Sequence, residues 1–557
     1  MPITKILIFI FIYFITINSQ GSTLIHNIHG YTSTNTGLLQ FEGLLFDEQG
    51  KILKTLSQKA VTDLLATAAK LKDSNESLLN IIDGKGKYLL PGLIDAHGHV
   101  LSYGEALATV DLVGTTSAEE AVKRVADFVA NNADKQWIIG RGWNQVLWKS
   151  KEFPDAEMLD KVAPGKPIVL GRIDGHANWL NNTALKLAGI DKNTLDPAGG
   201  EILRDDQGNP TGVLVDNAMD MVWDKIPPLS KEQREAYILK ALQALASEGI
   251  TSVHDAGVST AEINSFKNLA TNNQLIVRIY AMLGVNSTDY LKSLNKGIEK
   301  SLFDDRLSVQ SIKISIDGAL GSRGAALDAP YSDRKDTSGL MLHTEQETEA
   351  LTLQAMKAGF QVNSHAIGDR GNRLLLDIFS KYPEYRHLRH RIEHAQIVHL
   401  EDIPRFKELH VIPSMQPTHA TSDMNMAKDR VGEKRLKGSY AWRKFLNLDV
   451  VIASGSDFPV EPANPFFGLH AAVTRQSRDN QPDGGWRPEE KMTREEALRS
   501  FTLDAAYAGH QEKVLGSLEK GKWADFILID QDYFAIDEKD IWKINVLQTW
   551  QAGKRVY

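Results

Sequence analysis

A short apolar stretch, Leu89–Val100, contains two histidines separated by one residue. Residues two apart on a strand point to the same side of it, so His97 and His99 can bind one metal ion together. The glycine between them, Gly98, is typical of a strand end that another group approaches closely. We therefore interpret this stretch as half of a metal site, whose other half must lie elsewhere in the chain.

Polar residues recur at the ends of later strand-like segments. His365, His394 and Asp457 each end such a segment, and Lys313 lies inside one between two isoleucines. A lysine that points into a protein interior is unfavourable unless its charge is altered. Taken singly, a histidine at a strand end is more often structural, and Asp457 is compatible with a turn or a helix cap. The joint pattern is hard to obtain by chance and predicts that these side chains converge.

The composition limits the functions that the chain can have. With 557 residues, the chain is too long for one simple core and is expected to form a large domain with smaller additions. Its contents of 42% hydrophobic and 24% charged residues are ordinary for a globular protein. The net charge of -8 and the lack of a basic run argue against nucleic-acid binding. The absence of cysteine excludes disulfides, thiolate ligands and a cysteine nucleophile. A metal site must use His, Asp, Glu or Lys, which favour zinc, manganese or iron over copper(I).

The N-terminus resembles a targeting segment. Lys5 precedes a 12-residue apolar run, Ile6–Ile17, which is too short for a comfortable membrane span. Residues 1–21 therefore predict a signal peptide or an N-terminal anchor, and the alternative is a buried first strand. We expect an exported protein, periplasmic or secreted, with membrane contact only through this segment if it is not cleaved.

Strand-like runs alternate with helical patterns between the two ends of the chain, which predicts an α/β fold with a parallel sheet. Residues 92–509 contain eight such runs and predict a (β/α)8 barrel. Residues 22–91 and 510–557 predict one small β-sandwich domain built from both chain ends. Residues 105–235 predict an α+β insertion after the first barrel strand, on the face where barrel enzymes hold their active sites. The seven later runs are 249–255, 277–282, 311–317, 359–365, 390–394, 410–414 and 450–457.

Several motifs carry a resemblance to a known family. Leu90–His99 resembles the opening motif of the amidohydrolase superfamily. Gly516–Asp525 is similar to the segment through which the chain of that superfamily leaves the barrel and re-enters its small β domain. The resemblance covers residues 23–557, so the signal-like N-terminus is an addition. Further motifs resemble the branch that contains N-substituted formamide deformylases, the amidohydrolase 3 or YtcJ-like group. These are Asp317–Arg323, His365–Asp369, Glu393–Ala395 and Ser456–Val460.

The resemblance implies a site for one or two divalent metal ions, zinc with Mn²⁺ or Fe²⁺ as alternatives. Lys313, carboxylated by carbon dioxide, would bridge the two ions, which would remove the unfavourable burial of its charge. The ligands of the more buried ion would be His97, His99 and Asp457, and those of the second ion His365 and His394.

The resemblance also implies hydrolysis of a non-peptide carbon–nitrogen bond in a small amide, formamide or cyclic amide. A metal-activated hydroxide would attack the carbonyl carbon, and Asp457 would shuttle the proton. His176 and Arg323 are candidates to stabilise the oxyanion, although a structural role suits His176 equally well. A lactone or ester hydrolase and a catalytically inactive binding or regulatory protein of this fold remain alternatives. The expected partner is a small molecule, and a homodimer is compatible with the family.

Other residues near the expected site have weaker assignments. His419 is a candidate for the rim, and His254-Asp255 for support of the ligands. The insertion is expected to shape the substrate pocket. Its residues Trp143, Asn144 and Trp179 could line an apolar pocket there or form the core of the insertion itself.

Overall fold

The computed structural model describes residues 21–72, 79–173, 175, 177–197 and 199–557. The predicted signal or anchor lies outside the described residues except for Gly21, and His176 lies outside them too. Within the described ranges, no helix is both long and apolar enough to cross a membrane.

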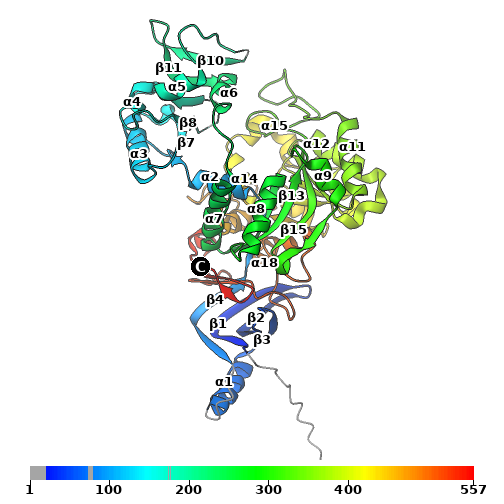
Figure 1. Cartoon of the computed structure of the whole chain (residues 1–557). Helices are drawn as coiled ribbons and strands as arrows, with labels where there is room; N and C mark the ends of the chain where they lie inside the picture. The colour runs from blue at the N-terminus through cyan, green and yellow to red at the C-terminus, as the bar shows by residue number, and fades with distance from the viewer. Residues whose placement is uncertain (1–20, 73–78, 174, 176, 198) are drawn as a thin grey trace, which may run out of the picture.

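The described residues contain a nearly closed barrel of eight parallel strands, so the predicted (β/α)8 fold is confirmed. Helices connect the strands and surround them (Figure 1). Three of these helices begin with capping boxes at Ser230, Ser259 and Thr344, in which the side chains of residues N-cap and N3 bond each other's backbone N–H groups. The strands are β5 (Leu93–Gly98), β12 (Ile250–Val258), β13 (Arg278–Gly284), β15 (Leu307–Ser315), β16 (Gln361–Ala366), β17 (Arg391–His394), β18 (Ile412–Met415) and β19 (Ala453–Ser454). The principal helices are α7 (Lys231–Ser247), α8 (Thr260–Thr271), α11 (Glu345–Lys357), α12 (Asp369–Lys381), α13 (Ile403–Leu409) and α17 (Pro465–Thr474).

The first strand and the segment after the last strand close the barrel. The backbone N–H of Asp457 donates to the carbonyl of His97 at 2.7 Å, and the N–H of His99 donates to the carbonyl of Phe458 at 2.9 Å. A Cβ on Gly98 would lie 2.4 Å from the Phe458 ring, so this position tolerates only glycine. The close approach expected at Gly98 is therefore present, and this junction brings the histidine pair to Asp457.

Both chain ends build one curled sheet of seven strands below the barrel (Figure 1). Phe46 and Phe526 lie on strands that are not neighbours in the sheet, yet their ring centroids are 6.1 Å apart. The sandwich is thus one continuous sheet whose two halves enclose a shared apolar core. Its strands, in sheet order, are β22 (Lys554–Arg555), β21 (Val546–Gln551), β20 (Phe526–Ile529), β4 (Asn80–Pro91), β1 (Thr23–Thr34), β2 (Gly37–Phe46) and β3 (Ile52–Leu56). Helix α1 (Gln58–Lys72) covers the outside of β2 and β3.

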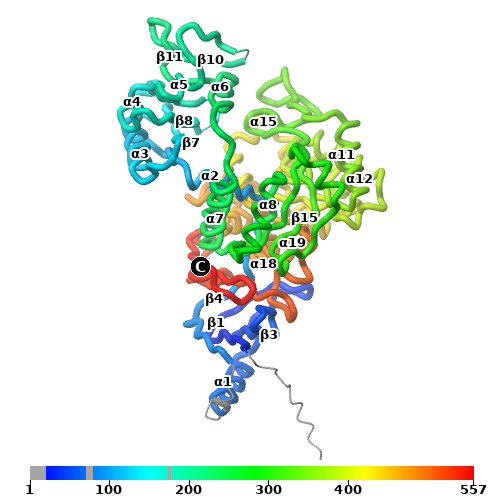
Figure 2. The backbone as a smooth tube through the Cα atoms, in the orientation of Figure 1, coloured from blue at the N-terminus to red at the C-terminus, as the bar shows by residue number. Residues whose placement is uncertain are grey.

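The insertion forms a separate lobe with its own sheet and its own cores. It joins the barrel through α2 (Val100–Leu107) and α7, which pack against each other so tightly that a Cβ on Gly104 would lie 2.0 Å from the Tyr237 carbonyl oxygen. Figure 2 shows the two connections side by side at these helices. The sheet order is β10 (Gly200–Arg204), β11 (Pro210–Asp216), β9 (Ala177–Leu180), β8 (Ile168–Arg172), β7 (Ile138–Trp143) and β6 (Val110–Asp111), with α3 (Ala118–Asn131), α4 (Ala156–Asp160), α5 (Asn182–Ala188) and α6 (Asp220–Trp223) around it.

The aromatic residues of the insertion belong to its core. Trp143 and Trp179 are fully buried, and their indole N–H groups donate to the carbonyls of Leu170 and Asp155. The side chain of Asn144 caps a short 3₁₀ turn by accepting from the N–H of Val146. Of the two roles expected for these residues, the structure supports the internal one.

Candidate metal centre

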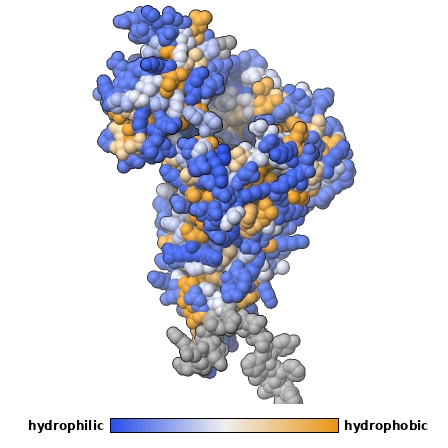
Figure 3. Space-filling model, viewed as in Figure 1, coloured by the Kyte–Doolittle hydropathy of each residue, from blue (hydrophilic) through white to orange (hydrophobic). Residues whose placement is uncertain are grey.

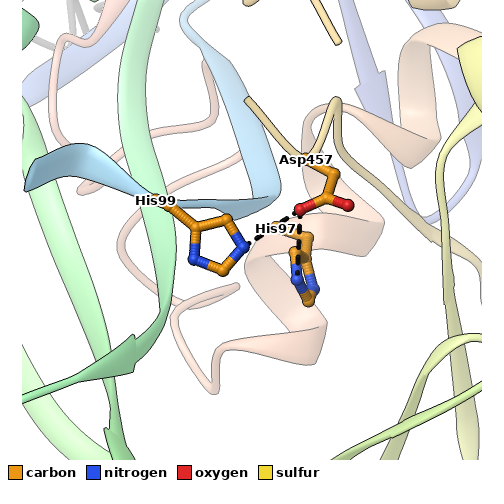
Figure 4. Close-up of side chains that lie close together, drawn as sticks. All are labelled: His97, His99 and Asp457. Atoms are coloured by element: carbon orange, nitrogen blue, oxygen red, sulfur yellow. Dashed lines mark hydrogen bonds and ion pairs between the residues drawn. The ribbon is translucent and has the colours of Figure 1, made fainter. Parts of the chain in front are cut away.

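Three predicted ligands meet at the junction that closes the barrel. His97 and His99 extend from β5, and Asp457 faces them from the segment after β19 (Figure 4). Oδ1 of Asp457 lies 3.1 Å from Nε2 of His99 and 3.7 Å from Nε2 of His97. These three donor atoms lie within 4.8 Å of one another, a spacing that one metal ion can bridge.

The histidines are oriented by oxygen acceptors on their far ring nitrogens. Nδ1 of His97 lies 2.5 Å from Oε2 of Glu393, and Nδ1 of His99 lies 2.9 Å from the carbonyl oxygen of Ala256. An N–H on Nδ1 that donates to such an acceptor leaves Nε2 with its lone pair directed at the centre. Histidines that bind a metal commonly donate their other ring N–H to an oxygen acceptor.

Glu393 is in turn held by a buried ion pair with Arg391. Nε of Arg391 lies 2.8 Å from Oε1 of Glu393, and both side chains are fully buried. The same guanidinium donates to Nδ1 of His254 and to the carbonyl of Ala96, the residue before His97. His254 therefore supports the site through Arg391, as expected, whereas Asp255 accepts from the N–H of Val100.

The roles of Arg391 and Glu393 were missed by the sequence analysis, although the residues lie in a strand that was recognised. Residues 391 and 393 are two apart and share one face of β17. The pattern that could have identified them is a pair of opposite charges on the inner face of a barrel strand. Unpaired charges are unfavourable in a barrel interior, so such residues are expected to pair with each other. His394 would point to the opposite face, but its φ of +75° ends the strand and turns its ring inward, 4.7 Å from the ring of His97.

Lys313 lies beside the first histidine. Its Nζ is 3.1 Å from Nε2 of His97, and the side chain lies among the residues that line the cavity. Burial lowers the pKa of Lys313 to about 8, although Glu393 and Asp457 favour its charged form. Burial, followed by the charge of Lys313, lowers the pKa of His97 to about 4. Both groups therefore have a substantial neutral fraction near pH 8, as metal-site chemistry requires.

Asp457 is the electrostatic counterpart of the histidines. Burial opposes its ionisation, but the hydrogen bond to His99 and the charges of the surrounding histidines outweigh burial and hold its pKa well below the usual range. Its backbone adopts a φ of +64°, a strained conformation that is often found at functional sites. The adjacent Ser456 is pinned by Asp95, whose carboxylate accepts from the serine hydroxyl at 2.6 Å and from the N–H of His97 at 3.0 Å.

The structure places His365 and His394 next to each other, with ring centroids 4.6 Å apart. Nδ1 of His394 lies 2.8 Å from Oε1 of Gln416, so its Nε2 faces the centre. Nε2 of His365 instead lies 3.4 Å from Oδ1 of Asp317. The second group of donor atoms within 4.8 Å consists of His394, Asp457 and His419, and His365 is outside it.

Arg323 does not lie where the sequence analysis expected it. Its guanidinium binds the carboxylate of Asp333, with Nη2 and Oδ2 2.8 Å apart, and it is not among the residues that line the cavity. Asp317 is held instead by backbone N–H groups of Ala326, Ile367 and Gly368. A φ of +63° turns Arg323 toward Asp333, a turn that its sequence neighbours did not reveal. This position argues against a catalytic role for Arg323.

The candidate ligands open into a cavity of about 720 Å³ at the carboxyl ends of the barrel strands. No described residue between 105 and 235 lines this cavity. The insertion faces a second cavity of about 400 Å³, which includes Arg141, Asn178 and, from the barrel, Pro459. Figure 3 shows a hollow between the lobe and the barrel. The described residues of the insertion thus line this neighbouring cavity and not the metal cavity, where the sequence predicts their contact with the substrate.

Comparisons with known proteins agree with this geometry. A model of the amidohydrolase family matches residues 80–557. YtcJ of Bacillus subtilis (strain 168), which is named as an amidohydrolase, is 30% identical over 477 residues, or 85% of this chain and 89% of that protein. The N-substituted formamide deformylase of Arthrobacter pascens is 24% identical over 505 residues, or 88% of this chain and 92% of that protein.

A solved structure shows the same fold. The crystal structure of an uncharacterised metal-dependent hydrolase from Pyrococcus horikoshii OT3 matches with a TM-score of 0.77 and 28% identity, covering 93% of this chain and 99% of that chain. The family match and the two relatives confirm the resemblance to the amidohydrolase 3 or YtcJ-like branch.

Proposed function

This chain belongs to the amidohydrolase family, and from that premise we propose that it is a metal-dependent hydrolase of a non-peptide carbon–nitrogen bond in a small amide, formamide or cyclic amide. The observation that carries the proposal is the convergence of three Nδ1-anchored histidines and one ionised carboxylate in a single buried cavity. The histidines are His97, His99 and His394, and the carboxylate is that of Asp457.

The donor set fits a divalent metal ion. Imidazole nitrogens and a carboxylate suit zinc, manganese and iron, and no thiolate is available. Nε2 of His365 and Nε2 of His419 are buried without a hydrogen-bond partner in the described structure. Buried polar atoms without partners are unfavourable, and a bound cation would satisfy them. We propose zinc as the ion, with His97, His99 and Asp457 at the more buried position and His394 at the second.

His97, His99, His394 and Asp457 would hold a divalent ion, which would supply a water of lowered pKa and polarise a carbonyl group. The chain's own contribution is proton transfer. Oδ1 of Asp457 is engaged by His99 at 3.1 Å, which leaves Oδ2 to take the proton from the attacking water and deliver it to the leaving nitrogen. The pKa of Asp457 is held below its usual range, so its carboxylate is ionised at neutral pH and Oδ2 carries no proton of its own.

We further propose that Lys313 is carboxylated. Its pKa of about 8 leaves part of the amine neutral at physiological pH. The neutral amine forms an N–C bond with carbon dioxide and loses one proton, giving an anionic carbamate. The Nζ atom already lies 3.1 Å from Nε2 of His97, so the carbamate oxygens would extend into the ligand cluster.

The substrate class rests on the relatives and on the cavity. The Arthrobacter pascens relative is named for N-substituted formamides, and the present chain covers most of its length. The cavity of about 720 Å³ is large enough for a small molecule and opens to solvent at the barrel mouth. The sequence of residues 1–21 supports export of the protein, which also stays a proposal.

The test is metal analysis combined with a substrate screen. Protein from cells grown with zinc and bicarbonate should contain one or two zinc ions per chain. It should hydrolyse at least one member of a panel of N-formyl, N-acyl and cyclic amides, and activity should disappear on chelation and return with zinc. Freshly prepared protein that binds no divalent metal would refute the proposal. A metal-loaded protein that hydrolyses only lactones or esters would refute the carbon–nitrogen assignment alone.

A further inference from the structure

His419 lies in the centre although it is not one of the six residues that the motifs assign to the metals. It belongs to α14 (Pro417–Asp423), the short helix that follows β18. Only 8% of its surface is exposed, and its Nε2 has no hydrogen-bond partner among the residues that the structure describes. That atom lies 3.6 Å from Oδ2 of Asp457, and its ring stacks on that of His394 at a centroid distance of 5.8 Å.

A chain of hydrogen bonds sets the orientation of this ring. The amide of Gln396 lies between His419 and Tyr440, with its nitrogen 3.2 Å from Nδ1 of His419 and its oxygen 3.2 Å from the Tyr440 hydroxyl. The hydroxyl also lies 2.6 Å from Oδ2 of Asp423. The tyrosine has one proton, and the shorter contact to the carboxylate takes it. The Tyr440 oxygen must then accept, rather than donate, at Gln396.

This requirement decides which end of the amide faces His419. The oxygen and nitrogen of a glutamine amide exchange places by a half-turn, and the hydrogen-bond network determines the correct assignment. Turned in this way, the amide nitrogen of Gln396 donates to Tyr440, and its oxygen accepts a proton from Nδ1 of His419. Each of these hydrogen bonds then has one donor and one acceptor, and Nε2 of His419 keeps a lone pair directed into the centre.

The same arrangement occurs at three other histidines of the centre. Nδ1 of His97, His99 and His394 each faces an oxygen acceptor, at 2.5, 2.9 and 2.8 Å, with Nε2 directed inward. His365 lacks this arrangement, because its Nε2 faces Asp317. From this shared geometry we infer that His419 is a metal ligand at the second position, paired with His394. The inference rests on the proposed metal-dependent function and adds a ligand that the strand-end pattern does not contain.

The experiment measures metal binding directly. Wild-type, His419→Asn and His387→Asn proteins, the last altering an exposed histidine far from the centre, are dialysed against buffered free Zn²⁺ and analysed for bound metal. We expect the affinity for the second ion to fall by about 100-fold or more in His419→Asn. Loss of a residue that only orients a ligand already lowers metal affinity by ~10–100-fold, and loss of the ligand itself should have a larger effect. His387→Asn should match the wild type. Cobalt-substituted proteins give a second readout, since loss of a ligand changes the visible absorption of the second equivalent.

A further pair of variants tests the orienting chain. Gln396→Leu removes the acceptor for Nδ1 of His419 and should weaken the second ion by about 10–100-fold, whereas Gln396→Glu keeps an oxygen acceptor and should retain binding. His419→Asn protein with wild-type metal content, affinities and cobalt spectrum would overturn the inference while leaving the proposed function intact. A wild-type protein that binds no metal would instead overturn the proposed function.

Discussion

The barrel mouth and the insertion are stabilised by different kinds of interaction. At the mouth, buried polar groups are connected in series, such as His97 to Glu393 to Arg391. The insertion is organised by apolar packing around Trp143 and Trp179. Among the described residues, the insertion contributes none to the metal cavity and several to its neighbour.

From this difference we expect the residues at the mouth to determine catalysis and those of the insertion to determine substrate preference. A network of buried charges is sensitive to any single change, because a partner that is left unpaired in a low-dielectric interior is strongly destabilising. A lobe with its own core can vary its edge without disturbing that network. We therefore expect changes at the mouth to abolish metal binding, turnover or folding, and changes at the edge of the lobe to alter substrate preference.

The largest effect is expected at Asp457. Asp457→Asn removes the proton acceptor but keeps the size of the side chain, so kcat should fall by about 10²–10⁴-fold, the usual contribution of a general base. The exposed Asp449 provides a matched control, and Asp449→Asn should leave kcat unchanged. Thermal unfolding of each variant checks that the fold is retained. Full activity of folded Asp457→Asn protein would remove the proton shuttle from the mechanism.

Glu393 should affect both stability and the metal. Glu393→Gln leaves the buried guanidinium of Arg391 without its counter-charge, which should lower the free energy of unfolding by about 3–5 kcal/mol. The weaker acceptor at Nδ1 of His97 should also reduce metal affinity by about 10–100-fold. Urea denaturation in the presence of a chelator isolates the first effect. Glu384→Gln, at an exposed position, serves as the control, and equal stability of the two variants would contradict the network.

The pH dependence of stability should report Lys313 in metal-free protein kept free of carbon dioxide. Its pKa is lowered from 10.5 to about 8 on folding, chiefly by burial. Between these values the unfolded chain binds more protons than the folded one, so the free energy of unfolding should rise with pH from about 8 to 10.5. The rise is on the order of 3 kcal/mol. Lys313→Met, which cannot be charged, should lack this contribution, and a wild type that shows the same profile as the variant would contradict it.

The strand-end pattern predicted the barrel and most of the centre because parallel strands bring their carboxyl ends to one face. His97, His99, His394 and Asp457 were predictable since each lies at the end of a strand or within three residues after it. His419 was identified only as a rim residue, because it belongs to a helix whose direction depends on long-range packing. Its orientation rests on Gln396, Tyr440 and Asp423, whose sequence separations conceal their contact.

Two features of the structure depend on backbone geometry and long-range packing, which the residue pattern does not specify. A left-handed φ turned Arg323 toward Asp333 and away from the cavity, and no residue pattern reveals such a turn outside glycine. The aromatic residues of the insertion could not be assigned between a pocket and a core, because both uses favour large apolar side chains. Long-range packing, which the structure supplies, decided both cases.

The smallest effect is expected at the edge of the insertion. Arg141 is exposed at the second cavity, near the buried amide of Asn178, whose Nδ2 has no hydrogen-bond partner in the described structure. If part of the substrate reaches this cavity, Arg141→Ala should raise KM by about 2- to 5-fold, the range of a solvent-screened charge. Metal content and kcat should stay unchanged, because a contact made equally in the ground state and the transition state affects KM but not kcat. Lys186→Ala, an exposed change in the same lobe outside this cavity, should leave KM unaltered. A loss of bound metal in Arg141→Ala protein would show that the lobe and the mouth are coupled, and the separation between chemistry and selectivity would then fail.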